Sequence, residues 1–351
     1  MKVIHIESGL GNQMLSFCEY LALKQANPHD DFFLETIIYD IPECNEVTCQ
    51  WNGYELERIF GLSSVPNVKE LFSEEQWKDV ISKVRQSEFW RKNMNFPVYF
   101  CQAFQEAGVS LENTFGDFEA PHIYKAHQQD KSSLKYKMKQ TLPWLYLKRF
   151  KETTLLKWKG LNLDHSDELF INTDANLFAG QKLKFKYKGY GVEKIEKKIR
   201  ETFKFPPFTD DKNKEAAEQI SSCNSVAIHA RRGDMLGTNG YYYRTGYFRK
   251  AVSYIRQNVT NPVFFVFCDP GSISWAKENA NILGLNFQKD RICFVDWNKG
   301  LESFRDMQLM SLCKHQVITN SSFGWWGAWL NDNPDKITCS PDYKINTTNT
   351  F

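Results

Sequence analysis

The chain has 351 residues, of which 42% are hydrophobic, 15% aromatic and 25% charged, and its formal net charge is +2. A disordered chain would not carry so many large apolar side chains, and the length favours a globular protein of about two domains. The sequence has no apolar run of the ~18 residues that a membrane span needs, and Glu7 with a glycine-rich turn stands where a signal peptide would be apolar. The nine cysteines are scattered without a C-x-x-C pair, so we expect reduced thiols in a cytoplasmic protein.

The N-terminal part is predicted to open with a strand and a helix. Apolar residues alternate over residues 2–7, and they recur at helical spacing over 13–27, where Asn27-Pro28 ends the helix. A glycine-containing turn over 8–12 joins the two elements. The other elements expected here are, in chain order, a strand over 31–35, helices near 74–93 and 100–108, a strand over 182–188 and a helix over 191–203.

The C-terminal part alternates strands and helices more clearly. A proline-containing stretch, 205–211, breaks regular structure, and we place the domain boundary there, between 1–205 and 206–351. Strands alternating with helices of about 10–13 residues indicate βαβ units, a parallel sheet and therefore an α/β fold. The strands are predicted over 225–230, 263–268, 291–296, 315–320 and 336–339, and the helices near 247–259, 272–283, 301–313 and 323–330.

Charge is unevenly distributed along the chain. Residues 121–204 contain 19 Lys and Arg against 9 Asp and Glu, a net charge of +10. Such a segment suits anionic lipid headgroups, a phosphate-linked acceptor or nucleic acid, although a solvated lysine-rich surface is the simpler interpretation. Nucleic acid is the least favoured partner, because these lysines lie outside any known recognition motif.

Two motifs are suited to an anionic ligand at the ends of predicted strands. Arg231 and Arg232 follow the strand over 225–230 within the sequence HARRGD, and their planar guanidinium groups match phosphate oxygens. Ser321 and Ser322 follow the strand over 315–320 and are natural N-caps of the next helix, whose free amides favour an anion. Together they predict a diphosphate site. His229, by its alternation with Ile228, is by itself typical of a hydrogen-bonded structural residue.

A third motif, Gly9-Leu10-Gly11-Asn12, lies between the first strand and the first helix. Glycines there let the backbone approach a ligand, but Met14 stands at the third glycine position of a G-x-G-x-x-G pattern, so a simple tight turn remains an alternative. The sequence has no D-x-D pair of the kind that many sugar-nucleotide enzymes use to hold a divalent cation. We therefore expect an enzyme whose arginines, rather than a metal, neutralise the diphosphate.

At these stretches the sequence resembles the bacterial α-1,2-fucosyltransferases of glycosyltransferase family 11. The matching pieces are GLGNQM (9–14), NGYELERIF (52–60), HARRGD (229–234) and LMSLCKHQVITNSSFGWWGAWL (309–330). The resemblance implies a GT-B-like fold of two Rossmann-like domains facing a cleft, with an acceptor-side domain over 1–205 and a domain that binds the GDP-sugar over 206–351. Residues 65–200 contribute little to it.

The resemblance also implies an activity, the inverting transfer of L-fucose from GDP-fucose to the 2-hydroxyl of a galactoside in a surface glycan, without a metal or other cofactor. The expected partners are GDP-fucose and a galactose-containing glycan or lipid-linked oligosaccharide, with contact at the inner face of an anionic membrane as a further expectation. The catalytic candidates are Glu7, Asn12, Arg231 and Arg232, and the candidate donor-binding residues are Gly11, His229, Asp234, Ser321, Ser322 and Phe323. The sequence departs from the family pattern at Glu7-Ser8, which precedes the turn where glycines are common, at Met235 and Gly324, and at 267–275, which replaces a run with two acids.

The expected mechanism is a direct displacement through an oxocarbenium-like transition state. Negative charge grows on the leaving β-phosphate, where Arg231, Arg232 and helix-end amides would stabilise it. The group that takes the proton of the acceptor hydroxyl is open between Glu7 and a phosphate oxygen of the leaving group. A related transferase with another donor or linkage, and a non-catalytic glycan-binding protein, are the alternative functions.

Overall fold

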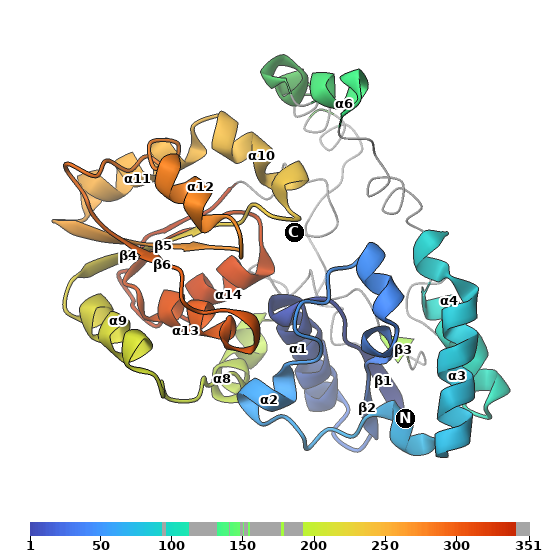
Figure 1. The fold of residues 1–351 in the computed structure, drawn as a ribbon. Helices are drawn as coiled ribbons and strands as arrows, with labels where there is room; N and C mark the ends of the chain where they lie inside the picture. The colour runs from blue at the N-terminus through green and yellow to red at the C-terminus, as the bar shows by residue number, and fades with distance from the viewer. Residues whose placement is uncertain are drawn as a thin grey trace. The chain divides into compact units, whose positions relative to one another are not determined.

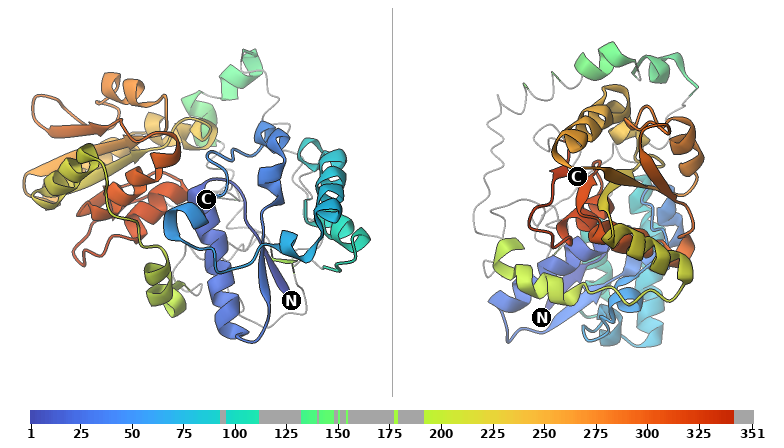
Figure 2. Two further views of the ribbon diagram at one scale, coloured as in Figure 1. Left: turned by 60° about the horizontal axis from the view of Figure 1, so that its bottom comes forward. Right: turned by 90° about the vertical axis from the view of Figure 1, so that its left-hand side faces the viewer.

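The computed structural model describes residues 1–92, 96–111, 132–139, 141–147, 150, 154, 177–178 and 192–341. The chain divides into two compact units, Met1–Tyr136 with Asn162–Lys204, and Lys137–Leu161 with Phe205–Phe351. Each unit is built on a parallel sheet (Figures 1 and 2). The predicted α/β fold with Rossmann-like domains is therefore confirmed, whereas the cleft between the domains and the roles assigned to them stay predictions.

The first unit contains a sheet of order β2-β1-β3, formed by β1 (Lys2–His5), β2 (Phe32–Glu35) and β3 (Leu177–Phe178). Helix α1 (Leu10–Ala26) packs against α8 (Val192–Thr202), and on the other side of the sheet lie α3 (Glu74–Ser87) and α4 (Phe96–Glu106) (Figure 1). The shorter helices described before the second unit's main body are η1 (Ile37–Asp40), η2 (Pro42–Glu46), α2 (Leu56–Phe60), η3 (Val68–Leu71), η4 (Phe89–Arg91) and α6 (Leu134–Lys139).

The second unit contains five parallel strands in the order β6-β5-β4-β7-β8. These strands are β4 (Asn224–Ala230), β5 (Pro262–Cys268), β6 (Arg291–Val295), β7 (His315–Val317) and β8 (Thr338–Cys339). The chain moves outward from β4 in one direction through β5 and β6 and then returns to add β7 and β8 on the other side. This is the order 3-2-1-4-5, the first five strands of a doubly wound dinucleotide-binding fold, and it places a switch point between β4 and β7.

Alternating side chains of the strands explain why helices cover both faces of this sheet. Val226 and Ile228 of β4 join one core with α10 (Leu236–Arg244), α11 (Tyr247–Asn258) and α12 (Ile273–Glu278). Ala227 joins the opposite core with α9 (Asp211–Ser221), α13 (Phe304–Leu312) and α14 (Ser322–Trp329). A short helix, η7 (Gly300–Glu302), precedes α13. Figure 1 shows the two groups of helices on opposite faces.

Most predicted elements of the second unit are present, but several boundaries differ. In the first unit, helix α1 begins at Leu10, so Gly11 and Asn12 lie in its first turn rather than in a loop. The sequence analysis missed α9 and α10, of which α9 begins where Asp210 accepts a hydrogen bond from the backbone of Asn213. The predicted strand over 182–188 and most of the basic segment 121–204 lie outside the described residues.

The sequence also led to predictions about the cysteine thiols and about membrane-spanning helices. All nine cysteines are free thiols, as expected from their scattered positions. Across the part of the chain that the structure describes, the helices are too short or too polar to traverse a lipid bilayer.

Candidate active site

Seven of the ten predicted site residues gather at the switch point between β4 and β7. In doubly wound sheets, ligands bind in the crevice outside the carboxyl ends of the strands at this point. The loop after β4 contributes Arg231, Arg232 and Asp234, and the loop after β7 leads to Ser321 and Ser322 at the start of α14; His229 and Phe323 lie beside them. The other three, Glu7, Gly11 and Asn12, lie together after β1 in the first unit.

The turn after β4 is fixed by hydrogen bonds to its backbone. The carboxylate of Asp269, which follows β5 and is buried, accepts the backbone N–H of Arg232 at 2.5 Å and that of Gly233 at 2.9 Å. Its Oδ2 atom also accepts the hydroxyl of Ser272 at 2.6 Å. The backbone N–H of Arg231 lies 3.3 Å from Thr319 Oγ1. The turn is therefore held rigid before any ligand arrives.

Gly233 is required by this arrangement because the backbone passes very close to Asp269. A Cβ at position 233 would lie 2.8 Å from Asp269 Oδ2 and 3.2 Å from its Cγ. The sequence analysis did not single out Asp269, although it is the one acid at the end of a predicted strand in 267–275. Asp269 holds the turn that contains Arg231 and Arg232, which we call the arginine turn. This role accounts for the presence of an acid within residues 267–275.

The two arginines are held in different ways. Arg231 Nη2 lies 2.7 Å from Asp234 Oδ1, so Asp234 orients the Arg231 side chain within this loop. The Arg232 guanidinium carbon lies 3.4 Å from the ring centroid of Trp275 and 5.1 Å from that of Tyr243. Burial lowers the pKa of Arg232 below its ordinary value, but a guanidinium group stays charged at neutral pH. The site thus presents two oriented cations.

The start of α14 packs directly on the end of β4. Ser321 and Ser322 are buried, and Ser321 is the extended residue before the first turn of the helix. A Cβ at Gly324 would lie 2.4 Å from His229 Nδ1, so only glycine allows α14 to approach β4 this closely. This explains why glycine rather than serine occupies position 324 in this chain. The helix N-terminus is consequently placed beside the arginine turn.

His229 is a buried, uncharged part of this contact. Burial and the nearby Arg231 charge lower its pKa to about 3, and its ring stacks on Phe323 with centroids 5.7 Å apart. Its Nδ1 atom is buried and has no hydrogen-bond partner within the described residues. These are the features of a structural residue, as the sequence pattern predicts, rather than those of a proton donor.

In the first unit, the chain leaves β1 through a strained turn. Ser8 has a φ of 63°, a left-handed conformation that glycine adopts more readily. A Cβ at Gly9 would lie 2.7 Å from Trp51 Cδ1, so this glycine is needed for close packing. Asn12 Oδ1 is buried and has no hydrogen-bond partner in the described parts of the chain. The turn places Glu7, Gly11 and Asn12 beside the start of α1.

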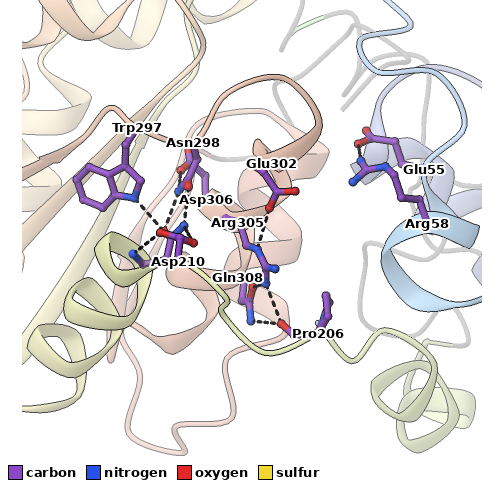
Figure 3. Close-up of polar contacts among 11 residues, drawn as sticks. Glu55, Arg58, Pro206, Asp210, Trp297, Asn298, Glu302, Arg305, Asp306 and Gln308 are labelled. Atoms are coloured by element: carbon purple, nitrogen blue, oxygen red, sulfur yellow. Dashed lines mark hydrogen bonds and ion pairs between the residues drawn. The ribbon is translucent and has the colours of Figure 1, made fainter.

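A buried glutamine ties this turn to the stretch 52–60. Gln13 Nε2 donates to the carbonyls of Ser8 at 2.9 Å and Gly53 at 2.8 Å, and its Oε1 accepts the backbone N–H of Glu55 at 2.8 Å. The Glu55 carboxylate in turn pairs with Arg58 at 2.6 Å (Figure 3). Two of the sequence motifs, GLGNQM and NGYELERIF, are therefore parts of one hydrogen-bonded structure.

Below the carboxyl edge of the second sheet, a polar network joins α9, the loop after β6 and α13 (Figure 3). Asn213 Oδ1 accepts from Trp297 Nε1 at 2.9 Å, and Asn298 Nδ2 donates to Asp306 Oδ1 at 2.8 Å. Burial raises the pKa of Asp306 to about 8, although the hydrogen bond from Asn298 opposes this shift. The sequence analysis missed this carboxyl group, which has no motif around it.

A second set of contacts fixes α13 to the start of the unit. Arg305 Nη1 donates to the carbonyl of Pro206 at 2.8 Å and to Gln308 Oε1 at 2.7 Å, and Arg305 Nε lies 3.2 Å from Glu302 (Figure 3).

Within the described residues, the structure contains no cluster of three or more His, Cys, Asp or Glu side chains suited to a metal ion.

Comparison with known proteins gives one family and several relatives. Residues 187–344 match the model of glycosyl transferase family 11. An α-1,2-colitosyltransferase of Escherichia coli is 35% identical over 151 residues, which are 42% of this chain and 49% of the relative. Galactoside α-(1,2)-fucosyltransferase 1 of Saimiri boliviensis boliviensis is 28% identical over 110 residues, 30% of this chain and 28% of the relative. The chain thus spans half or less of the length of these curated relatives.

Among solved structures, that of NodZ α-1,6-fucosyltransferase with GDP aligns with a TM-score of 0.42 and 10% identity, covering 93% of this chain and 90% of that one. The matches to the family model and to the curated relatives confirm the resemblance to glycosyltransferase family 11, which the family model places over residues 187–344.

Proposed function

We propose, starting from the family 11 domain of residues 187–344, that the chain is an inverting, metal-independent fucosyltransferase. It moves L-fucose from GDP-fucose to the 2-hydroxyl of a galactoside. The α-1,2 linkage is supported by the names of two curated relatives, an α-1,2-colitosyltransferase and a galactoside α-(1,2)-fucosyltransferase. The assignment to α-1,2 transfer is a proposal for the whole chain, because those relatives are matched over only part of their length.

The observation that carries this proposal is the rigid arginine turn at the switch point between β4 and β7. When the bond between the sugar and the β-phosphate breaks, its electron pair and negative charge go to the phosphate. Arg231 and Arg232 are proposed to meet that charge, and their backbone is already held in place, because Thr319 accepts the N–H of Arg231 and Asp269 accepts that of Arg232. Such a prearranged group stabilises the transition state without having to reorganise. Two guanidinium groups also supply the positive charge that a metal provides in enzymes with a D-x-D pair.

The remaining site residues are given supporting roles. Ser321, Ser322 and Phe323, at the start of α14, are proposed to contact the phosphate and ribose of the donor. Asp234 orders the loop through Arg231, and His229 packs the loop against α14. In the first unit, Gly11 and Asn12 are proposed to meet the donor. The buried Asn12 Oδ1, which lacks a partner in the described residues, supports a ligand contact there.

One specific observation favours a second donor. The α-1,2-colitosyltransferase of Escherichia coli is named for colitose rather than fucose, so both sugars are candidates for the donor sugar. A competition assay with GDP-fucose and GDP-colitose at equal concentration separates them. We expect fucose to be the preferred sugar, and a preference for colitose would replace the proposed donor while keeping the linkage.

The proposed activity is tested by incubating the chain with GDP-fucose, a panel of galactosides and EDTA, followed by NMR analysis of the product linkage. Calorimetric titration with GDP, with UDP and CMP as controls, checks the donor site on wild type and on Arg231→Ala. We expect an α-1,2 product and GDP-selective binding that the variant loses. Binding of glycan without any consumption of donor would instead support a non-catalytic glycan-binding protein.

We also propose peripheral contact with an anionic membrane, where a lipid-linked acceptor would lie. In the stretch 134–150, several large apolar side chains are exposed, and lysines at 135, 137 and 139 lie between them. Apolar and cationic side chains together suit an anionic lipid surface. The exposed apolar residues of this stretch are Leu134, Met138, Leu142, Trp144, Tyr146, Leu147 and Phe150.

Vesicle co-sedimentation tests this contact. Binding is expected to need anionic lipid, to weaken with salt and to be lost in Leu134→Asp/Met138→Asp. A Phe287→Asp variant, which removes an exposed apolar residue elsewhere, is the control. Absence of binding, or binding that ignores both salt and the double substitution, would contradict the proposal.

A further inference from the structure

Three ionisable side chains form a charged cluster at the carboxyl end of β1. His5 Nδ1 is hydrogen-bonded to Glu35 Oε2, and His5 Nε2 lies 3.7 Å from Glu7 Oε2. The side chains of Glu35 and His5 are 0% and 2% exposed, whereas that of Glu7 is 17% exposed. The cluster therefore has two buried members and one that reaches the surface. It lies at the switch strand of the first sheet, since β1 is flanked by β2 on one side and β3 on the other.

The imidazole ring of His5 is held from every side. It stacks on Phe96 with centroids 4.4 Å apart and an interplanar angle of 26°, and Phe100 meets it edge-on at 5.7 Å. Glu35 is the register partner of His5 on the neighbouring strand and also accepts the backbone N–H of Ile37. A ring fixed in this way cannot turn, so its Nε2 atom points toward Glu7 with a set direction.

The distances from His5 to Glu35 and to Glu7 determine which carboxylate compensates the imidazolium charge. Burial opposes a charge on His5, but the Glu35 and Glu7 carboxylates together raise its pKa to about 9. The imidazolium is hydrogen-bonded to Glu35 and lies further from Glu7, so its charge is largely compensated by Glu35. Within this cluster, two carboxylates and one imidazolium leave one net negative charge, and Glu7 is the exposed carboxylate that lies further from the imidazolium.

Two other titratable groups that face this cluster, Tyr39 and Cys44, are neutral at pH 7. Tyr39 of η1 and Cys44 of η2 both feel the Glu7 carboxylate, and burial raises the pKa of Tyr39 well above its ordinary value and that of Cys44 to about 12. Asp40, at the end of η1, feels Glu35, and burial raises its pKa. The imidazolium of His5 is thus a positive group that this part of the structure holds beside Glu7.

We propose that His5 and Glu35 are positioning residues that keep Glu7 ionised and aimed as the base for the acceptor hydroxyl. This inference rests on the proposed fucosyl transfer. As the acceptor oxygen bonds to the anomeric carbon, the bond from that carbon to the β-phosphate oxygen breaks and its electron pair leaves with GDP. The hydroxyl proton passes to the Glu7 carboxylate, and the cluster changes from a net charge of −1 to zero. Glu35 keeps the His5 ring protonated and oriented toward Glu7.

The main test uses the double variant His5→Gln/Glu35→Gln. Removing both charges together avoids leaving one of them buried without a partner, and the amides keep the approximate shape. We expect kcat for transfer to fall about tenfold or more, because the base is no longer held in direction. The acidic limb of the kcat profile should move to higher pH, because Glu7 loses its cationic neighbour. GDP affinity should stay within about twofold of wild type.

Comparison variants separate a positioning role from a structural one. Glu7→Gln should lower kcat about 100-fold or more, as expected for loss of a general base. Glu46→Gln, which removes an exposed carboxylate paired with Arg91 in the same unit, should leave kcat unchanged. An active wild type with an unchanged acidic limb in the double variant overturns this inference alone. A wild type that transfers no sugar to any galactoside overturns the proposed function on which it rests.

If the double variant does not fold, the ring of His5 can be observed in the intact chain by ¹⁵N NMR. The imidazole is expected to stay protonated through pH 8 in wild type and to titrate at lower pH in Glu7→Gln. A ring that is neutral at pH 7 in wild type, or one whose titration does not respond to Glu7→Gln, overturns the proposal.

Discussion

Replacing Gly233 by alanine tests whether the turn after β4 must approach Asp269 as closely as the structure indicates. The added methyl group would lie 2.8 Å from Asp269 Oδ2, well inside contact distance. Asp269 is buried and hydrogen-bonded to Arg232, Gly233 and Ser272, so it cannot move without loosening the turn. Overpacking of this kind costs about 1–3 kcal/mol, and a hydrogen bond to a charged group contributes about 1.5–3 kcal/mol.

Two readouts follow from these magnitudes. The midpoint of thermal unfolding should fall by roughly 2–10 °C for a unit of this size. Because the arginine turn would be loosened before the ligand arrives, GDP affinity should fall about 10- to 100-fold in calorimetric titration. Gly240→Ala is the matched control, since a Cβ there would meet nothing within 4 Å. A Gly233→Ala variant that matches this control in both measurements would refute the close approach.

Three further predictions concern stability. The pKa of His5 is raised to about 9 from 6.5, so its protonation stabilises the fold below pH 6.5 and this stabilisation is lost as pH rises through 9. The excess unfolding free energy of wild type over His5→Gln/Glu35→Gln, measured in urea, should shrink by roughly 3 kcal/mol between pH 6 and pH 10; a constant difference would contradict the charge assignment. Because the pKa of Asp306 is raised to about 8 from 3.8, wild-type stability should decline by up to about 1.4 kcal/mol per pH unit between pH 4 and 8, and Asp306→Asn should remove that decline. Ser8→Gly should raise the unfolding free energy by about 1 kcal/mol by relieving the left-handed backbone, and a loss of stability would show that Ser8 is not strained.

The sequence was sufficient to predict the residues at the switch point of the second unit. Strand periodicity located β4 and β7, and in a parallel sheet the residues that follow each strand must lie at the same edge. This is why Arg231 and Ser321, which are 90 positions apart in the sequence, could be assigned to one site. The family resemblance then narrowed the anion to a nucleotide diphosphate.

The residues that support the site could not be predicted in the same way. Asp269 follows β5 and accepts hydrogen bonds from backbone amides that follow the neighbouring strand β4. No side-chain motif predicts such a contact. His5 and Glu35 lie on two strands that were both predicted, but their pairing depends on the register of β1 against β2, which short strands do not specify. Helix α9 was missed because the prolines before it were interpreted as the end of regular structure, although Asp210 was present as an N-cap.

The three hydrogen bonds of Gln13 have a consequence for building hybrid enzymes. An exchange of the first βα unit between related transferases, made to alter acceptor choice, would separate Gln13 from the carbonyl of Gly53 and the amide of Glu55 if the junction fell between them. The buried amide would then face an unmatched backbone. Crossover points placed after residue 60 keep the whole structure in one parent, so libraries cut there should yield folded hybrids far more often than libraries cut between residues 14 and 52.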